Sequence, residues 1–212
     1  MNTIAGVVLA AGAGRRFGGG KQLAELEGRP LLEHALAAAA EAALDPRFVV
    51  LGANSDGILA GVDLHGHEVV LCPDWDEGMA ASLRAGVQAA RSAGAGAILV
   101  TLGDQPRVGA EAIGRVLGAR GGPEGTSRAV RASYEGVPGH PALLEDSLFD
   151  ALLELHGDEG ARGVFKAANT HLVPCGDIAD LVDVDEVGDL EALSRASSTP
   201  PGGARPRGRP QR

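Results

Sequence analysis

Aromatic side chains are scarce in this chain of 212 residues, where Phe, Trp and Tyr together make up 3%. Because 44% of the residues are nevertheless hydrophobic, the core has to be built from Leu, Val and Ala. Only two cysteines are present, Cys72 and Cys175, which excludes a disulfide framework, and no metal-binding spacing links them. The length suits one domain of ordinary size.

Long apolar runs are also missing, and none reaches the roughly 20 residues of a membrane-spanning helix. Residues 1–3 hold no basic stretch, and the apolar residues 7–11 are too few for a secretory leader. We therefore expect a cytoplasmic protein with no membrane partner. Basic residues are outnumbered, giving a net charge of −9. Since nucleic-acid binding depends on neutralising phosphates, we expect no nucleic-acid partner.

The last residues, 197–212, contain almost nothing to bury and are rich in Arg, Pro and Gly. A segment of this composition gains too little from burial to offset the entropy lost on folding, so we expect it to be disordered. Residues 1–196 are then expected to form the single folded domain.

A glycine-rich basic loop follows the first apolar stretch, residues 7–9, which is expected to be a buried strand. The segment from Val7 to Lys21 contains five glycines and two arginines. Glycine lets the backbone approach a ligand closely, and consecutive N–H groups can cradle an anion. Gln22 after Lys21 breaks the pattern G-x-x-x-x-G-K-[ST], and Phe17 breaks G-x-G-x-x-G. The loop therefore predicts a di- or triphosphate site of a third kind.

The remaining pattern alternates short apolar stretches with segments of helical periodicity, which predicts βαβ units and a mostly parallel sheet. The most apolar stretch, residues 97–102, is expected at the centre of that sheet. Further strands are expected at 48–51, 68–72, 128–134, 171–174 and 180–184, and helices at 30–44, 80–93, 111–117, 142–155, 164–168 and 187–195.

Asp104 is the strongest candidate for chemistry, because it lies two residues past the most apolar strand. Ligands of parallel sheets bind beyond the carboxyl ends of the strands, where the glycine-rich loop also lies. A carboxylate opposite a phosphate loop suits Mg²⁺, whose usual ligands are one or two carboxylates and substrate phosphates. Asp183 and Asp185 flank Val184, and either could supply a second carboxylate; a polar strand end with a helix N-cap explains them equally well.

Four other side chains are candidates for contacts with a substrate. Arg16 and Lys21 are placed to bind phosphates and to neutralise charge that develops during transfer. His140, between Gly139 and Pro141, is either a substrate contact or polar surface. Trp75 is either core or a platform for a flat heterocycle, and core is preferred.

Read together, these motifs resemble the MobA-like nucleotidyltransferases and, within them, the molybdenum cofactor cytidylyltransferase (MocA-like) branch. The opening signature is Leu9-Ala10-Ala11-Gly12 with Arg16, Gly18 and Lys21, followed by Gln22-Leu23 and residues 28–34. The later marks are Gly78-Met79, Ser82-Leu83, Gly103-Asp104-Gln105-Pro106, Pro138-Gly139-His140-Pro141, residues 157–162 and Asp183-Val184-Asp185.

The resemblance implies a Rossmann-like three-layer α/β/α sandwich of the nucleotide-diphospho-sugar transferase type. It implies a Mg²⁺-dependent transfer of CMP from CTP to the phosphate of molybdenum-molybdopterin, with release of pyrophosphate. Arg16, Lys21 and Asp104 would be catalytic, and Asp104 with Asp183 or Asp185 would bind the metal. The implied nucleotide contacts are Leu9, Ala10, Ala11, Gly12, Ala13, Gly14, Arg16, Lys21 and Gly103. The implied contacts with the second substrate are Gly78, Met79, Ser82, Gln105, Pro106, Gly139 and His140.

Three alternatives stay open at this point. The first is a transferase of the same family that uses GTP or another phosphorylated acceptor. The second is an NAD(P)H-dependent oxidoreductase of the nicotine-blue type, although the second expected strand is followed by Gly52-Ala53-Asn54, with no acid before Asp56. The third is a non-catalytic chaperone that hands the cofactor to a molybdoenzyme.

Overall fold

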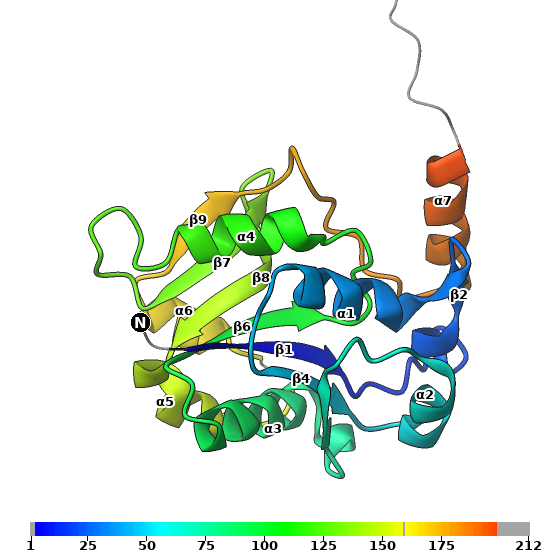
Figure 1. The fold of residues 1–212 in the computed structure, drawn as a ribbon, viewed down its shortest axis with the longest axis horizontal. Coiled ribbons are helices and arrows are strands. Elements are labelled where there is room, and N and C mark those ends of the chain that lie inside the picture. Colours follow the sequence, from blue (N-terminus) through cyan, green and yellow to red (C-terminus); the bar gives the residue numbers. More distant parts are fainter. Residues whose placement is uncertain (1–2, 159, 199–212) are drawn as a thin grey trace, which may run out of the picture.

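The structure of the protein, a computed structural model, describes residues 3–158 and 160–198. Within this part of the chain, seven strands form one central sheet in the order β5-β4-β1-β6-β8-β7-β9 (Figure 1). The strands are β1 (Ile4–Ala10), β4 (Arg47–Leu51), β5 (Glu68–Leu71), β6 (Ala97–Leu102), β7 (Ala129–Tyr134), β8 (Val137–Glu145) and β9 (His171–Pro174). Two short strands, β2 (Glu25–Leu26) and β3 (Arg29–Pro30), form a separate antiparallel pair.

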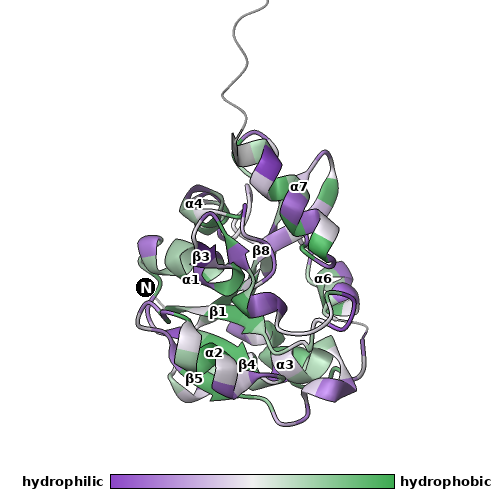
Figure 2. Cartoon of the chain, turned by 90° about the vertical axis from the view of Figure 1, so that its right-hand side faces the viewer, coloured by the Kyte–Doolittle hydropathy of each residue, from purple (hydrophilic) through white to green (hydrophobic). Residues whose placement is uncertain are grey.

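Helices cover both faces of the central sheet. α1 (Leu31–Glu41) and α4 (Ala110–Gly118) pack on one face, and α3 (Met79–Ser92) and α5 (Phe149–Leu153) on the other (Figure 1). Figure 2 shows the central strand β1 as hydrophobic between the helical layers. The remaining helices are α2 (Ser55–Gly61), α6 (Arg162–Ala167) and α7 (Val187–Ser198), with 3₁₀ turns at Lys21–Leu23, Trp75–Glu77 and Asp146–Leu148.

The sheet is mostly parallel, because β1 pairs in parallel with both β4 and β6, β4 with β5, and β7 with β9. Only the pairings of β8, with β6 and with β7, are antiparallel. The predicted fold class, a three-layer α/β/α sandwich, is therefore confirmed. β1 and β6 end side by side, with Leu9 opposite Leu102, so the two loops that follow them begin at the same edge of the sheet.

The predicted helix over 142–155 is wrong in its first half. Residues up to Glu145 belong to β8, and the α-helix covers only Phe149–Leu153. Ala142, Leu143 and Leu144 are all buried because both faces of β8 are covered. A strand buried on both faces shows a continuous apolar run, which periodicity cannot distinguish from a helix. His140, expected in a loop, therefore lies in β8.

The predicted strand over 180–184 is also wrong, since these residues follow an irregular path. The backbone N–H of Val184 donates to the carbonyl oxygen of Asp104 at 3.0 Å, which brings this late segment beside the loop after β6. α7 then packs beside β2 around the buried side chains of Leu26, Val184 and Leu193 (Figure 1). The short helix α2 was not predicted.

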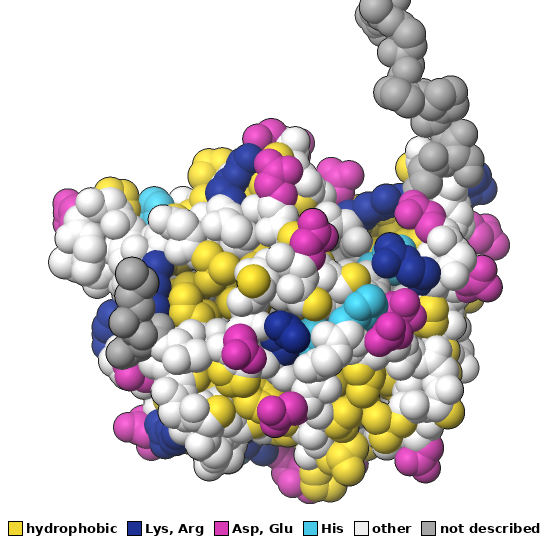
Figure 3. Space-filling model, viewed as in Figure 1, with side chains coloured by type: hydrophobic (Ala, Val, Ile, Leu, Met, Phe, Trp, Pro, Cys, Tyr) yellow, Lys and Arg dark blue, Asp and Glu magenta, His cyan; other side chains and the backbone are white. Residues whose placement is uncertain are grey.

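The predicted tail, 197–212, lies almost entirely outside the described residues; Ser197 and Ser198 end α7. Among the described residues, no helix is long and apolar enough to cross a membrane. On the face drawn in Figure 3, Lys and Arg side chains are scattered among Asp and Glu. That face therefore carries no continuous basic surface.

Candidate functional site

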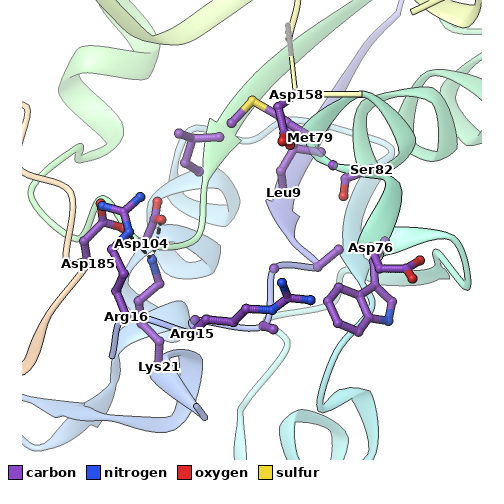
Figure 4. Close-up of a pocket in the computed structure, with 17 residues that line it drawn as sticks. Leu9, Arg15, Arg16, Lys21, Asp76, Met79, Ser82, Asp104, Asp158 and Asp185 are labelled. Carbon is purple, nitrogen blue, oxygen red and sulfur yellow. Dashed lines mark hydrogen bonds and ion pairs between the residues drawn. The ribbon is translucent and has the colours of Figure 1, made fainter. Parts of the chain in front are cut away.

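A cavity of about 470 Å³ opens where β1 and β6 end, and we call it the first chamber (Figure 4). One wall is the glycine-rich loop, and the opposite wall is the start of α3 with the turn before it. The lining residues are Leu9, Ala11, Gly12, Ala13, Gly14, Arg15, Arg16, Lys21, Trp75, Asp76, Gly78, Met79, Ser82, Leu102, Asp104, Asp158 and Asp185.

The glycine-rich loop is held in shape by one glycine and one amide side chain. At Gly14, where φ is +60°, a Cβ would lie 2.9 Å from the Cβ of Lys21, so the bare backbone lets the lysine lie against the loop. Gln22 donates from Nε2 to the carbonyl oxygens of Ala10 at 3.1 Å and Gly12 at 2.6 Å. Gln22 is 5% exposed, and a buried amide satisfied in this way fixes the path of the backbone. The sequence assigned Gln22 no role; a polar residue directly after the loop was its only signal.

A chain of opposite charges crosses the floor of the first chamber (Figure 4). The ammonium of Lys21 lies 2.8 Å from Oδ2 of Asp104 and 3.4 Å from Oδ1 of Asp185. Arg16 pairs with Oδ2 of Asp185 at 2.8 Å. Lys21 is only 9% exposed, and a lysine so far removed from water needs carboxylate partners. The structure thus brings together Arg16, Lys21 and Asp104 with Asp185, one of the two aspartates predicted as a possible second carboxylate.

Asp104 also carries a buried oxygen, Oδ1, that has no hydrogen-bond partner. A buried acceptor left unsatisfied costs about 1–3 kcal/mol, so such an atom in a cavity points to a missing ligand. Two carboxylates with a vacant oxygen fit Mg²⁺, which completes its coordination with phosphate oxygens and water. Among the described residues there is no group of three or more His, Cys, Asp or Glu side chains arranged for a metal. The residues present therefore fit a metal that is held jointly with a phosphorylated ligand.

The two candidate partners of Asp104 have different surroundings. Oδ1 of Asp183 accepts a hydrogen bond of 2.7 Å from Nε2 of Gln105. Burial raises the pKa of Asp183, and the charges of Asp104 and Asp185 act in the same direction. Asp185 instead shares Lys21 with Asp104. Asp185 therefore lies beside Asp104 at the shared lysine, whereas Asp183 anchors the segment through Gln105.

Of the other residues predicted to contact a substrate, some line the first chamber and some do not. Met79 and Ser82, predicted as contacts with the second substrate, line it from α3. Trp75, for which core was preferred, packs on the core and also lines the chamber. Gln105 and Pro106 line neither this chamber nor the second one described below. Gln105 is buried against Asp183, so the structure supports a positioning role for it.

A second chamber of about 490 Å³ adjoins the first and shares Leu9, Met79 and Asp158 with it. Its other lining residues are Leu83, Val100, Arg131, Val137, Pro138, His140, Leu144, Gly160, Ala161, Arg162 and Phe165. His140, predicted as a substrate contact, lies here, and the neighbouring Gly139 supplies a carbonyl oxygen to Arg131. Arg131 and Arg162 were not predicted as site residues. An arginine in the middle of a strand of small and apolar residues was the available signal for Arg131.

The second chamber leads to a prediction about acid stability. Burial lowers the pKa of His140 to about 4, and the charge of Arg131 lowers it too. Between pH 6.5 and about 4 the unfolded chain takes up a proton at this position that the folded chain does not. The free energy of unfolding is therefore expected to decrease as the pH is lowered from 6.5 to about 4, by about 3 kcal/mol in total.

Replacing His140 by Gln is expected to remove this share of the acid sensitivity. Urea unfolding at several pH values between 7 and 4.5 measures it, with the exposed His156→Gln as the matched control. If both variants lose as much stability as the parent over this range, the neutral state of His140 is disproved.

Comparison with known proteins identifies the family of the chain. Residues 6–172 match the MobA-like NTP transferase domain. Nicotine blue oxidoreductase from Paenarthrobacter nicotinovorans is 35% identical over 199 residues, covering 90% of this chain and 96% of the relative. Purine catabolism protein PucB from Bacillus subtilis (strain 168) is 29% identical over 203 residues, covering 91% and 97%.

A solved structure is similar over the same length. Rv0371c from Mycobacterium tuberculosis H37Rv, in complex with manganese, has a TM-score of 0.73 and 28% identity, covering 92% of this chain and 99% of that chain. The domain match spans most of the chain, and one relative above 30% identity aligns with nearly all of it. The family inferred from the motifs is thus confirmed, and the chain belongs to the MobA-like NTP transferase family.

Proposed function

We propose that this nucleotidyltransferase transfers CMP from CTP to the phosphate of molybdenum-molybdopterin and releases pyrophosphate. The observation that carries the proposal is the arrangement of Lys21 between two carboxylates, one with an unsatisfied oxygen, opposite a glycine-rich loop. The order of motifs from Leu9 to Asp185, which resembles the MocA-like branch, supports the choice of CTP and of a pterin acceptor.

Mg²⁺ is the proposed cofactor, and Asp104 and Asp185 would hold it. The manganese complex of Rv0371c supports the use of a divalent cation in this family. Such an ion supplies neutralisation of phosphate charge and alignment of the triphosphate. No third carboxylate is needed for this, because the nucleotide contributes phosphate oxygens.

The backbone and side chains of the first chamber account for the rest of the reaction. The backbone of the loop from Ala10 to Gly14 holds the triphosphate, and Gln22 keeps that loop in place. An oxygen of the acceptor phosphate attacks the α-phosphorus, the new P–O bond forms, and the bond to the β-phosphate oxygen breaks. Lys21 and Arg16 neutralise the charge that moves onto pyrophosphate. The attacking phosphate is already ionised, so positioning accounts for most of the acceleration and no covalent intermediate is needed.

The base would lie between the start of the loop and the start of α3. Ala10 ends β1 and Ala11 follows it, both with small side chains, and Trp75 and Ser82 line the opposite wall. An aromatic platform with nearby hydrogen-bonding groups suits a flat heterocycle. The pair Ala10-Ala11 resembles the cytidylyl form, which favours CTP over GTP.

An oxidoreductase is the second candidate function, because one relative of the chain is named nicotine blue oxidoreductase. A dinucleotide site of the Rossmann kind places an acidic residue at the end of the second strand to bind the ribose. Here β4 ends at Leu51 and is followed by Gly52-Ala53-Asn54, with no acidic residue before Asp56. No carboxylate therefore stands at the expected place, which favours transfer of a nucleotide. A cofactor chaperone would leave Asp104 and Asp185 dispensable.

A nucleotide panel tests the proposal. Pyrophosphate release is measured from CTP, GTP and ATP with Mg²⁺ or Mn²⁺, with and without molybdenum-molybdopterin, and NAD(P)H oxidation is followed in parallel. The expected result is pyrophosphate release from CTP only when the pterin acceptor is present. Preference for GTP or ATP, release without dependence on the acceptor, or NAD(P)H oxidation in its place would overturn it.

Lys21 gives a prediction for nucleotide binding. In Lys21→Ala, Asp104 and Asp185 lose their shared cation, and the triphosphate loses a charged donor. The KM for the nucleotide is expected to rise about tenfold or more, because hydrogen bonds to charged groups contribute most to binding. Steady-state kinetics with the nucleotide varied measures it. An unchanged KM would contradict the role of Lys21.

A further inference from the structure

The second chamber holds an arginine whose position is fixed from two sides. The guanidinium of Arg131 lies over the ring of Phe165, 4.3 Å from its centroid. Its Nε donates to the carbonyl oxygen of Gly139 at 3.1 Å. These contacts hold the plane of the guanidinium and leave the two terminal nitrogens for a ligand. Among the described residues, no carboxylate forms an ion pair with Arg131.

A second positive charge faces the same space. Arg162, at the start of α6, lines the second chamber and forms no ion pair with a described residue. Burial lowers the pKa of Arg131, and the charge of Arg162 lowers it further, so the two cations repel each other. Asp158 is the single described acid in the lining, and it lies at the boundary with the first chamber. The chamber therefore has an excess of positive charge that a bound anion would balance.

The rest of the second chamber is apolar. Leu83, Val100 and Leu144 are all nearly inaccessible to water, and Phe165 adds an aromatic ring. His140 adds no positive charge at neutral pH, since burial holds its pKa at about 4. Apolar walls with a few convergent polar groups are typical of sites for small organic ligands. A cavity with apolar walls and two arginines thus fits a flat, largely apolar ligand that carries one acidic group.

We propose that the second chamber is the acceptor subsite and that Arg131, assisted by Arg162, binds an acidic group of the acceptor, a carboxylate or a phosphate. Neither arginine lines the first chamber, so this group differs from the one that attacks the nucleotide. The acceptor would extend past Leu9 and Met79, which both chambers share. The assignment of this chamber to the acceptor rests on the proposed transferase function. The assignment of an anion site to Arg131 does not depend on that function.

Binding of small anions to the full chain tests the site without any nucleotide. Benzoate, phenyl phosphate and inorganic phosphate are titrated into the parent, Arg131→Met, Arg131→Lys and Lys21→Met proteins. Arg128→Met is the matched control, because Arg128 is exposed, lines neither chamber and carries the same charge. Thermal unfolding verifies that each variant is folded.

The expected result is that the parent and Arg128→Met bind benzoate or phenyl phosphate alike, and that Arg131→Met binds about tenfold or more weakly. Arg131→Lys should recover only part of the affinity, because an ammonium lacks the planar pair of donors. Lys21→Met should bind benzoate as the parent does, because Lys21 lines only the first chamber. If benzoate binds more tightly than phenyl phosphate, the acidic group is a carboxylate; if phenyl phosphate binds more tightly, it is a phosphate.

Three results would overturn the proposal: no binding of either aromatic anion to the parent, equal losses in Arg131→Met and Arg128→Met, or loss of benzoate binding in Lys21→Met. Inorganic phosphate binding as tightly as phenyl phosphate would contradict the role of the apolar walls. In turnover, Arg131→Met should raise the KM for the acceptor and leave the KM for CTP near the parent value. If the parent releases no pyrophosphate but Arg131→Met loses anion binding, the transferase proposal fails and the anion site stands.

Discussion

Replacing Asp104 by Asn is expected to reduce pyrophosphate release about 100-fold or more while the protein stays folded. The amide keeps the shape of the carboxylate but cannot supply the two charged oxygens. One of these oxygens pairs with Lys21 at 2.8 Å, and the other is buried and unsatisfied. Lys21 retains Asp185 as a partner, so the loss of one carboxylate leaves the lysine compensated. Activity and metal binding should therefore fall together, with only a small change in stability.

The measurements for Asp104→Asn are turnover, Mn²⁺ binding by calorimetry and thermal unfolding. Asp150→Asn is the matched control, because Asp150 pairs with Arg91 on the surface and its side chain is 89% exposed. That substitution should leave both turnover and Mn²⁺ binding near the parent values. Asp104→Asn with normal turnover at the ordinary Mg²⁺ optimum would disprove the metal assignment.

The first chamber was predictable because its parts depend on local patterns and one general rule. The glycine-rich loop and Asp104 each follow an apolar strand, and parallel strands end at one edge of the sheet. Which of Asp183 and Asp185 lies beside Lys21 was not predictable. It depends on an irregular segment held by a backbone hydrogen bond from Val184 to Asp104 and by the side-chain bond from Gln105 to Asp183, and no periodicity reports such bonds.

Only part of the second chamber could be predicted, because the rest depends on the sheet order. The sequence predicts a loop around His140 and a helix from Ala142, so nothing indicates that His140 lies in a strand beside β7. β8 turns the sheet antiparallel between β6 and β7, and this places Arg131 next to Gly139. The partner of Arg131, Phe165, comes from α6 and is 34 positions away along the chain, beyond the reach of local patterns.

The boundary between the two chambers depends on Gly78, which has a backbone conformation that side chains avoid. Its φ is 114° and its ψ is −171°, a region occupied almost only by glycine. A Cβ at this position would lie 2.8 Å from the backbone carbon and oxygen of Gly157 and would also overlap the carboxylate of Asp158. The N–H of Ala80 donates to the same Gly157 oxygen at 3.1 Å. Any side chain at Gly78 must therefore push the 157–158 loop away from the start of α3.

Gly78→Ala is accordingly expected to lower the free energy of unfolding by about 2–4 kcal/mol, combining backbone strain with the steric overlap. Turnover should also fall, because Met79 and Asp158 line both chambers and would move with the loop. Urea unfolding and steady-state kinetics measure the two effects. Gly114→Ala, in the exposed part of α4 with no atom within 4 Å of the added Cβ, should instead gain about 0.5–1 kcal/mol. If both variants change stability in the same direction, the contact between Gly78 and the 157–158 loop does not hold the two chambers together.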